Sequence, residues 1–154
     1  MILSYYLDSS ALVKRYVAES GSVWVADLMH RAQGNRIYLA EIAGAEVVAA
    51  LARRAAFGGS TRTFSIAAIA AFRLDFSSRF RLVETSQSLI ASAMNLAEQH
   101  SLRGYDSVQL AAMLQVNAEY AAVGRYCTLV SADVELNAAA VLEGITVENP
   151  NDHP

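Results

Sequence analysis

Two aspartates follow the ends of apolar segments in the same way. Asp8 comes directly after residues 2–7, a mostly apolar run with the length of a buried strand. Asp133 follows a second such run, residues 127–130, by way of a serine and an alanine. A strand, an acid, small hydroxyl residues and then a helix form the layout of a crossover in a parallel α/β domain. Ligands bind beyond the carboxyl ends of the strands in such domains, so both aspartates are candidate site residues.

Two further acids interrupt segments that are otherwise apolar. Glu46 is the only charged residue from Ile42 to Ala52, in a predicted helix that is apolar nearly all round. Such a helix is expected to be buried. Asp106 opens the apolar helix that we predict over 106–123. A buried carboxylate without a partner costs several kcal/mol, so such an acid should pair, become protonated or bind a cation.

Each of these acids also has a purely structural interpretation. Aspartate is a good residue to begin a helix, where it caps the backbone or offsets the helix dipole by up to roughly 1 kcal/mol. Glu46 could pair with Arg53 or Arg103, and Glu41 also follows a strand and competes with Glu46 for the same role. Singly, each acid is explained by structure, and only their convergence at one place would argue for chemistry.

Segments of strand and helix length alternate along the chain. The predicted strands are 2–7, 36–40, 80–83, 127–130 and 145–147. The predicted helices, after one that starts behind Asp8, are 21–33, 42–56, 61–78, one that Ser86 or Ser88 opens and that runs to His100, 106–123 and 134–142. The helix over 21–33 should turn four apolar residues inward, namely Val23, Val25, Leu28 and Met29. We expect one domain over 1–150, with a tail at 151–154 and fraying from Asn149 onward.

Strands separated by helices argue for a parallel sheet with right-handed crossovers, which is an α/β fold. If the strand order reverses beside the first strand, the first and fourth strands are neighbours. Asp8 and Asp133 then meet at the switch point, with Glu46 and Asp106 on the flanking helices. The topology therefore predicts that the four acids converge.

Carboxylates with no basic residue fixed among them would make a hard-oxygen metal site. Mg²⁺ or Mn²⁺ suits such a site, with several waters retained. The sequence has no Walker glycine loop, no Cys/His cluster and no evident nucleophile–base–acid triad. Acid clusters with divalent metals usually activate water and brace a phosphoryl leaving group.

The composition excludes several other classes of protein. At 54% hydrophobic and 18% charged, the chain can bury a full core. No apolar run approaches the roughly 20 residues of a membrane span, and the N-terminal run lacks the features of a signal peptide. The single cysteine, Cys127, suggests a cytoplasmic protein without disulfides. The three histidines are far apart in sequence, so we do not expect a zinc site.

Four short motifs occur in a specific order and spacing. They are Leu7-Asp8-Ser9-Ser10-Ala11-Leu12-Val13-Lys14, Glu46-Val47 with Ala50-Leu51-Ala52-Arg53-Arg54, Gly104-Tyr105-Asp106 with Gln109-Leu110-Ala111, and Ser131-Ala132-Asp133 with Leu136. Together they resemble the PIN-domain ribonucleases, and most closely the VapC toxins of bacterial toxin–antitoxin pairs. The resemblance spans nearly the whole chain and implies a PIN-like three-layer fold with a parallel sheet of order 3-2-1-4-5.

The same resemblance implies a function and its residues. It implies an endoribonuclease dependent on Mg²⁺ or Mn²⁺, a homodimer, and a cognate antitoxin that occludes the site. The implied catalytic and metal-binding residues are Asp8, Glu46, Asp106 and Asp133, with Ser10 and Ser131 as supporting polar residues. The family pattern favours Glu46 over Glu41, and Asp133 could act on the metal through water.

The net charge of −3 does not exclude an RNA substrate, because four acids set aside for a metal leave twelve basic residues against eleven acidic ones. Residues 53–81 hold six of the eleven arginines and all five phenylalanines. Arginine with aromatic side chains can bind a single strand by charge and stacking. We expect RNA contacts from Arg53 and Arg54 in this stretch, and also from Arg103. The spacing of Phe64, Phe72 and Phe76 also fits ordinary core or a partner groove.

Two other functions remain open at this stage. The first is a non-catalytic module with the same fold that binds RNA or a protein, its acids being structural. The second is a phosphatase of the haloacid dehalogenase type, which also has an aspartate after its first strand. That chemistry needs a second acid two residues later, where this chain has Ser10.

Overall fold

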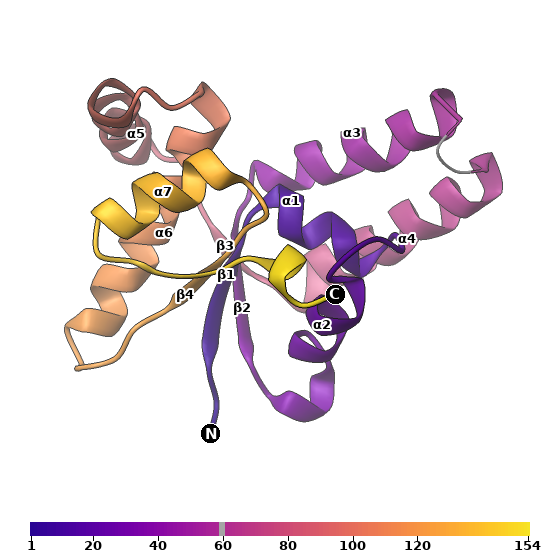
Figure 1. Cartoon of the computed structure of the whole chain (residues 1–154), viewed down its shortest axis with the longest axis horizontal. Coiled ribbons are helices and arrows are strands. Elements are labelled where there is room, and N and C mark those ends of the chain that lie inside the picture. The colour runs from indigo at the N-terminus through magenta and orange to yellow at the C-terminus, as the bar shows by residue number, and fades with distance from the viewer. Residues whose placement is uncertain (59–60) are drawn as a thin grey trace.

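The computed structural model describes residues 1–58 and 61–154. Within them, parallel strands form one sheet of order β3-β2-β1-β4-β5 (Figure 1). The strands are β1 (Ser4–Leu7), β2 (Arg36–Ala40), β3 (Arg81–Val83), β4 (Thr128–Val130) and β5 (Thr146–Glu148). The predicted α/β class and strand order are therefore confirmed.

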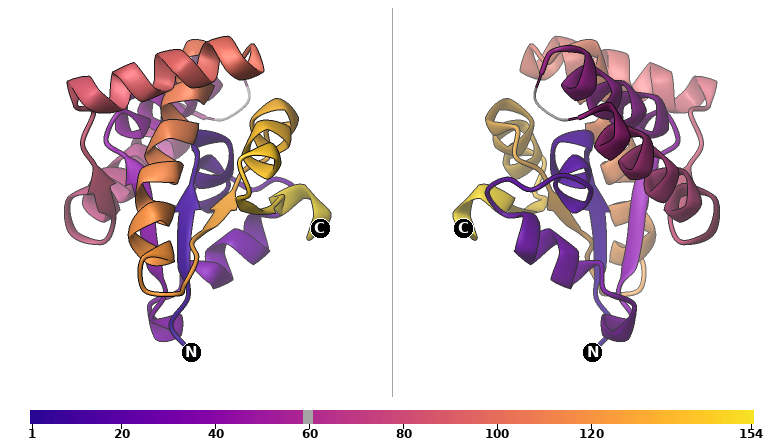
Figure 2. Two further views of the ribbon diagram at one scale, coloured as in Figure 1. Left: turned by 90° about the vertical axis from the view of Figure 1, so that its left-hand side faces the viewer. Right: turned by 90° about the vertical axis from the view of Figure 1, so that its right-hand side faces the viewer.

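Helices cover both faces of this sheet (Figure 1). On one face pack α5 (Gln87–His100), α6 (Gly104–Ala121) and α7 (Val134–Leu142). On the other pack α1 (Ser9–Leu12), α2 (Ser22–Leu28), α3 (Ala43–Ala56) and α4 (Arg62–Ser78). Short 3₁₀ turns complete the chain: η1 (Val13–Arg15), η2 (Arg31–Gln33) and η3 (Pro150–Asp152). Figure 2 shows α6 running alongside the sheet and α5 lying across the first turns of α6.

The core consists of two layers because the strands alternate their side chains across the sheet. Tyr6 and Leu129 face the layer under α5, α6 and α7, whereas Leu7 and Val130 face the layer under α1, α3 and α4. All four side chains are fully buried. Burying an aliphatic side chain of this size contributes about 1.5–3 kcal/mol, so the two-sided pattern holds the central strands in register.

The register of the central strands determines which loops become neighbours. Leu7 in β1 pairs with Val130 in β4, and the backbone N–H of Asp8 donates to the carbonyl oxygen of Val130 at 3.2 Å. Asp8 and Ser131 therefore begin two adjacent crossover loops at the carboxyl edge of the sheet. This is the switch point of the strand order, because the chain turns to opposite faces after β1 and β4.

The predicted helix over 21–33 is wrong in its second half. Helix α2 ends at Leu28, and His30 has an extended backbone whose imidazole Nδ1 accepts from the N–H of Ala32. That side-chain bond starts the separate turn η2 and replaces a further helical turn. Val23 was predicted to face inward but is 83% exposed, while the other three apolar residues of the set are buried.

The C-terminal tail does not fray at Asn149 as predicted. Pro150 is buried against Gly21, whose φ is +82°, and a Cβ on Gly21 would lie 2.3 Å from the Pro150 carbonyl oxygen. The imidazole of His153 stacks on the indole of Trp24, with 4.3 Å between ring centroids. These contacts attach the end of the chain to α2. In the described part of the chain, no helix has the length and apolarity needed to cross a membrane.

Candidate functional site at the switch point

Asp8 lies at the end of β1 and is buried, with only 5% of its surface exposed. Its Oδ1 accepts the backbone N–H of Ala11 at 3.0 Å, which caps α1. Two hydroxyl groups also donate to the carboxylate: Ser10 Oγ lies 2.7 Å from Oδ1, and Ser131 Oγ lies 3.0 Å from Oδ2. Asp8 is therefore both a helix cap and the acceptor of two serine hydroxyls.

The environment of Asp8 changes its ionisation. Burial raises the pKa of its carboxyl group from the ordinary 3.8 to about 6. The hydrogen bonds from Ser10, Ala11 and Ser131 lower this pKa, and the negative charge of Asp133 raises it further. Because desolvation outweighs the three donors, Asp8 binds a proton more readily than an exposed aspartate.

The loop after β4 is bonded to the loop after β1. Ser131 Oγ, which donates to Asp8, also accepts the N–H of Asp133 at 3.0 Å. Ser10 Oγ accepts the N–H of Ala132 at 2.9 Å. Asp133 caps α7 through its Oδ1, which lies 2.9 Å from the N–H of Leu136. The two serines thus hold both loops in one fixed arrangement.

Arg103 connects Asp106 and Asp133. Its Nε lies 3.1 Å from Asp106 Oδ2, and its terminal nitrogen lies 3.1 Å from Asp133 Oδ2. Burial, and then the charge of Asp133, raise the pKa of Asp106, while the Arg103 guanidinium lowers it. The expectation that no basic residue is fixed among the acids is therefore wrong. The α6 helix begins at Gly104, so Asp106 lies within its first turn and beside the guanidinium at residue 103.

Glu46 lies in the first turn of α3 and is half-buried. It accepts from the hydroxyl of Ser9 and from Gln109 Nε2, the latter at 3.2 Å. It forms no ion pair with either Arg53 or Arg103. Neutral donors hold this carboxylate, and one of them, Ser9, directly follows Asp8 in the sequence.

Glu41, the competitor for the same role, lies elsewhere. Its carboxylate accepts the N–H of Thr85 at 3.0 Å, in the loop after β3. Glu41 is therefore occupied at a different part of the sheet edge, whereas Glu46 contacts the residue beside Asp8.

The acids gather at one edge without forming a closed ligand set. Hydrogen bonds join Asp8, Ser131, Asp133, Arg103 and Asp106 into one chain of contacts. Across residues 1–58 and 61–154, no three His, Cys, Asp or Glu side chains lie close enough to hold one metal ion. The donors are nevertheless all carboxylate oxygens, and Mg²⁺ is commonly bound by one or two carboxylates with several waters retained. The donor chemistry therefore fits a hard divalent cation.

Comparison with known proteins identifies the family. A family model described as PIN domain matches residues 5–142, which is most of the chain and includes all four acids. This chain belongs to the PIN domain family. A comparison with curated proteins finds no match.

Solved structures share the fold of this PIN domain. VapC20 of Mycobacterium tuberculosis, described as a sarcin-ricin loop cleaving toxin, has a TM-score of 0.64 and 18% identity, over 88% of this chain and 95% of that one. VapBC2 of Rickettsia felis, bound to a DNA fragment from their promoter, has a TM-score of 0.62 and 17% identity, over 96% and 98%. PAE2754 of Pyrobaculum aerophilum has a TM-score of 0.62 and 22% identity, over 96% and 92%.

The other predicted RNA-binding arginines of the PIN domain lie along α3. Arg54 pairs with Glu19 at 2.9 Å, so part of its charge is already compensated. The guanidinium of Arg53 lies 5.5 Å from the centroid of the Phe57 ring. Both side chains are on the same helix as Glu46, toward its C-terminal end.

Three contact residues of this site were not predicted to be site residues. Ser9 and Gln109 bind Glu46, and the buried Tyr6 hydroxyl donates to Gln109 Oε1 at 2.6 Å. Gln109 carried a signal, because it is a polar residue inside the apolar run 107–114. Such a residue needs a buried partner. Tyr6 carried no signal, because a tyrosine in a strand is ordinary.

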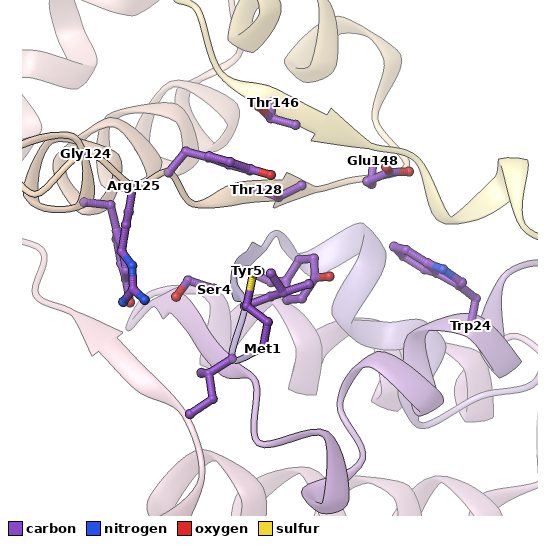
Figure 3. A pocket seen from close by; sticks show the side chains of 13 residues that line it. Met1, Ser4, Tyr5, Trp24, Gly124, Arg125, Thr128, Thr146 and Glu148 are labelled. Carbon is purple, nitrogen blue, oxygen red and sulfur yellow. The ribbon is translucent and has the colours of Figure 1, made fainter.

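A hollow lies at the amino ends of the strands, opposite the edge that carries the four acids (Figure 3). It has a volume of about 340 Å³ and is lined in part by Tyr5, Trp24, Arg125, Tyr126 and Glu148. None of the predicted site residues lines it. The predicted chemistry therefore belongs to the carboxyl edge alone.

Proposed function

We propose that this PIN domain is an endoribonuclease dependent on Mg²⁺ or Mn²⁺ and that it acts as the toxin of a toxin–antitoxin pair. The observation that carries the proposal is Asp8, a buried carboxylate with a raised pKa at the switch point, adjoined by Asp133. Support also comes from the fold, which this chain shares with a protein described as a sarcin-ricin loop cleaving toxin.

In this proposal the four acids bind the metal ion. Asp8, Asp106 and Asp133 would hold it, with Glu46 completing the set. When bound, the ion would activate water and offset charge on the scissile phosphate. Its charge would also compensate the repulsion between Asp106 and Asp133 that Arg103 offsets in this structure.

The other residues of the site position these groups. Ser10 and Ser131 donate to Asp8 and hold its carboxylate at the carboxyl edge of the sheet. Arg103 is 71% exposed and carries further N–H donors, which suit a phosphate oxygen. Arg53 and Arg54 extend the positive charge along α3, in the direction that a bound strand would take.

Protein partners are part of the same proposal. Helix α4 exposes three large apolar side chains, namely Phe64, Ile66 and Leu74. Exposed apolar side chains of this size are available to a protein partner. We propose that this helix contributes to a homodimer or to the surface that a cognate antitoxin covers.

Cleavage assays with purified protein test the proposal. Protein freed of any antitoxin should cut structured RNA in Mg²⁺ or Mn²⁺, and chelator should stop the reaction. Asp106→Asn should abolish cleavage, whereas Glu119→Gln, an exposed acid on the same helix, should not. Cleavage that survives chelation, or that persists in Asp106→Asn, contradicts the proposal.

One observation favours a second candidate, a non-catalytic module that binds RNA or protein. Arg103 already forms ion pairs with two of the four acids without any metal. A metal titration followed by calorimetry separates the two functions. Saturable Mg²⁺ or Mn²⁺ binding that Asp106→Asn weakens supports the nuclease, and RNA binding without metal binding or cleavage supports the module.

A further inference from the structure

A groove adjoins the candidate site along α3. It has a volume of about 750 Å³, within the range of small-ligand sites. Glu46 lies in its lining, together with three alanines of α3 that form a smooth floor. Arg53, Arg54, Phe57 and Tyr105 complete the lining. We call these eight residues the α3 groove.

Two aromatic side chains of the α3 groove are exposed to solvent. Phe57 is 78% exposed and Tyr105 is 49% exposed. Neither packs into the two core layers. Tyr105 directly precedes Asp106 in the chain, and its side chain lines the groove that Glu46 also lines. An exposed aromatic ring at that position is available for stacking.

The charge of the α3 groove favours a polyanion. The guanidinium of Arg53 lies over the Phe57 ring and forms no ion pair within residues 1–58 and 61–154. The charge of Arg54 is partly compensated by its ion pair with Glu19. Glu46, at the end nearest the candidate site, is the one acid in the lining. Guanidinium planes and aromatic rings are the two surfaces on which proteins stack unpaired RNA bases.

We propose that the α3 groove is a subsite for nucleotides of single-stranded RNA next to the scissile phosphate. Tyr105 stacks on the base nearest the cut, Arg53 with Phe57 binds the following nucleotide, and Glu46 marks the catalytic end. A partner helix would instead need an apolar groove, and here two cations and a carboxylate interrupt the lining. The subsite rests on the proposed nuclease function.

Equilibrium binding in chelator tests the subsite without cleavage. The probe is a fluorescent single-stranded oligoribonucleotide of about ten nucleotides, read by anisotropy. Tyr105→Ala should weaken binding roughly tenfold, since stacking on one base is worth about that much. Tyr105→Phe keeps the ring and should bind like wild type. Tyr126→Ala removes an aromatic residue at the opposite ends of the strands and should have no effect.

A scan with single abasic sites locates the base. Removing one particular base should cost wild type roughly tenfold in affinity, and should cost Tyr105→Ala almost nothing at the same position. Thermal melts of Tyr105→Ala should match wild type, because the side chain is outside the core. Loss of affinity with an unchanged melt supports the subsite.

Other outcomes overturn the proposal at different levels. If wild type cleaves RNA in Mg²⁺ while Tyr105→Ala and Tyr105→Phe bind RNA equally, the subsite is wrong and the nuclease function stands. If Tyr105→Ala changes only self-association in sedimentation, the groove is a protein interface and the subsite is wrong. If wild type neither binds nor cleaves RNA, the proposed function fails and the subsite fails with it.

Discussion

Ser131 donates to Asp8 across 123 positions of sequence, with 3.0 Å between Ser131 Oγ and Asp8 Oδ2. The contact exists because β1 and β4 are adjacent in the sheet, although three crossovers separate them in the chain. It places a donor on a carboxylate that burial makes reluctant to ionise. The candidate site is thereby tied to the assembly of the sheet, and its ionisation is tied to stability.

Asp8→Asn should raise the stability of the metal-free protein at neutral pH. The folded pKa of about 6 exceeds the ordinary 3.8, so Asp8 favours folding when it is protonated. That contribution is fully present below pH 4 and is lost as pH rises through about 6. With about 1.4 kcal/mol for each unit by which a pKa moves, the loss approaches about 3 kcal/mol at pH 7.5. Asparagine keeps the capping oxygen without the charge.

Thermal melts in chelator from pH 4 to pH 8 measure this effect. Asp8→Asn should melt above wild type at pH 7.5, and the difference should shrink as the pH falls through 6. Asp27→Asn, an exposed residue of α2, serves as the matched control. Parallel curves for Asp8→Asn and wild type would show that Asp8 is chiefly a structural cap. Adding Mg²⁺ should stabilise wild type more than the variant.

Arg103→Ala should make the protein respond more strongly to divalent metal. Removing the guanidinium leaves Asp106 and Asp133 with less compensation, and burial already raises the pKa of Asp106. A bound cation would then relieve more repulsion than in wild type. The rise of the melting temperature on adding Mg²⁺ should be larger in Arg103→Ala, and Arg125→Ala at the far end of the sheet should match wild type. An equal rise in all three proteins would mean that Arg103 does not compete with the metal.

The acids could be predicted from the sequence because a charged residue stands out in a segment that is otherwise apolar. Asp8 and Glu46 stand out in apolar segments, and the alternation of strands and helices predicts that strand ends share one edge. The strand order itself rested on the family resemblance, and the structure confirms it. Whether all four acids bind a metal stays a prediction, since the structure brings no three of the described His, Cys, Asp or Glu side chains within reach of one ion.

Side-chain partners were harder to predict than the acids themselves. The sequence shows that Arg103 precedes Asp106 by three residues, but its second bond depends on where α7 places Asp133. The docking of the tail was missed for a similar reason. Gly21 and Pro150 each resemble ordinary turn residues, and only the fold shows that the left-handed backbone of one accommodates the other.

Phe72 should be a core residue and Leu74 a surface one, although both lie in the phenylalanine-rich stretch. Phe72 is 1% exposed and its ring meets Tyr16 edge to face, with 5.4 Å between centroids. Phe72→Ala should cost about 3–5 kcal/mol of unfolding free energy in urea. Leu74→Ala should change stability by less than about 0.5 kcal/mol and should weaken any dimer or antitoxin complex that uses α4. Loss of association without loss of stability in Phe72→Ala would contradict this assignment.

Gly21→Ala should destabilise the fold more than Gly124→Ala. Both glycines have positive φ, so each substitution pays the same backbone cost of about 1 kcal/mol. Only at Gly21 would the new Cβ meet another group, the Pro150 carbonyl, whereas Gly124 has open space around it. The excess destabilisation of Gly21→Ala in urea melts therefore measures the docking of the C-terminal turn. Equal losses would mean that this turn contributes nothing to stability.

Gln109→Leu should reduce cleavage by more than its effect on folding explains. Gln109 is buried, accepts from the Tyr6 hydroxyl at 2.6 Å and donates to Glu46 at 3.2 Å. Leucine preserves the approximate volume but leaves the Tyr6 hydroxyl without its acceptor, which costs about 1–3 kcal/mol. It also removes one of the two neutral donors that hold the Glu46 carboxylate.

The double variant Tyr6→Phe with Gln109→Leu separates the two effects. Removing the Tyr6 hydroxyl abolishes the unsatisfied donor but also removes the acceptor of the Ala40 N–H at 3.2 Å, so the double variant should recover part of the lost stability. It cannot restore the donor to Glu46, so kcat should stay low in a Mg²⁺-supported RNA cleavage assay while KM changes little. Tyr6→Phe alone keeps that donor and should retain most of the activity. If the double variant regains both stability and kcat, Gln109 is a core residue only and does not position Glu46.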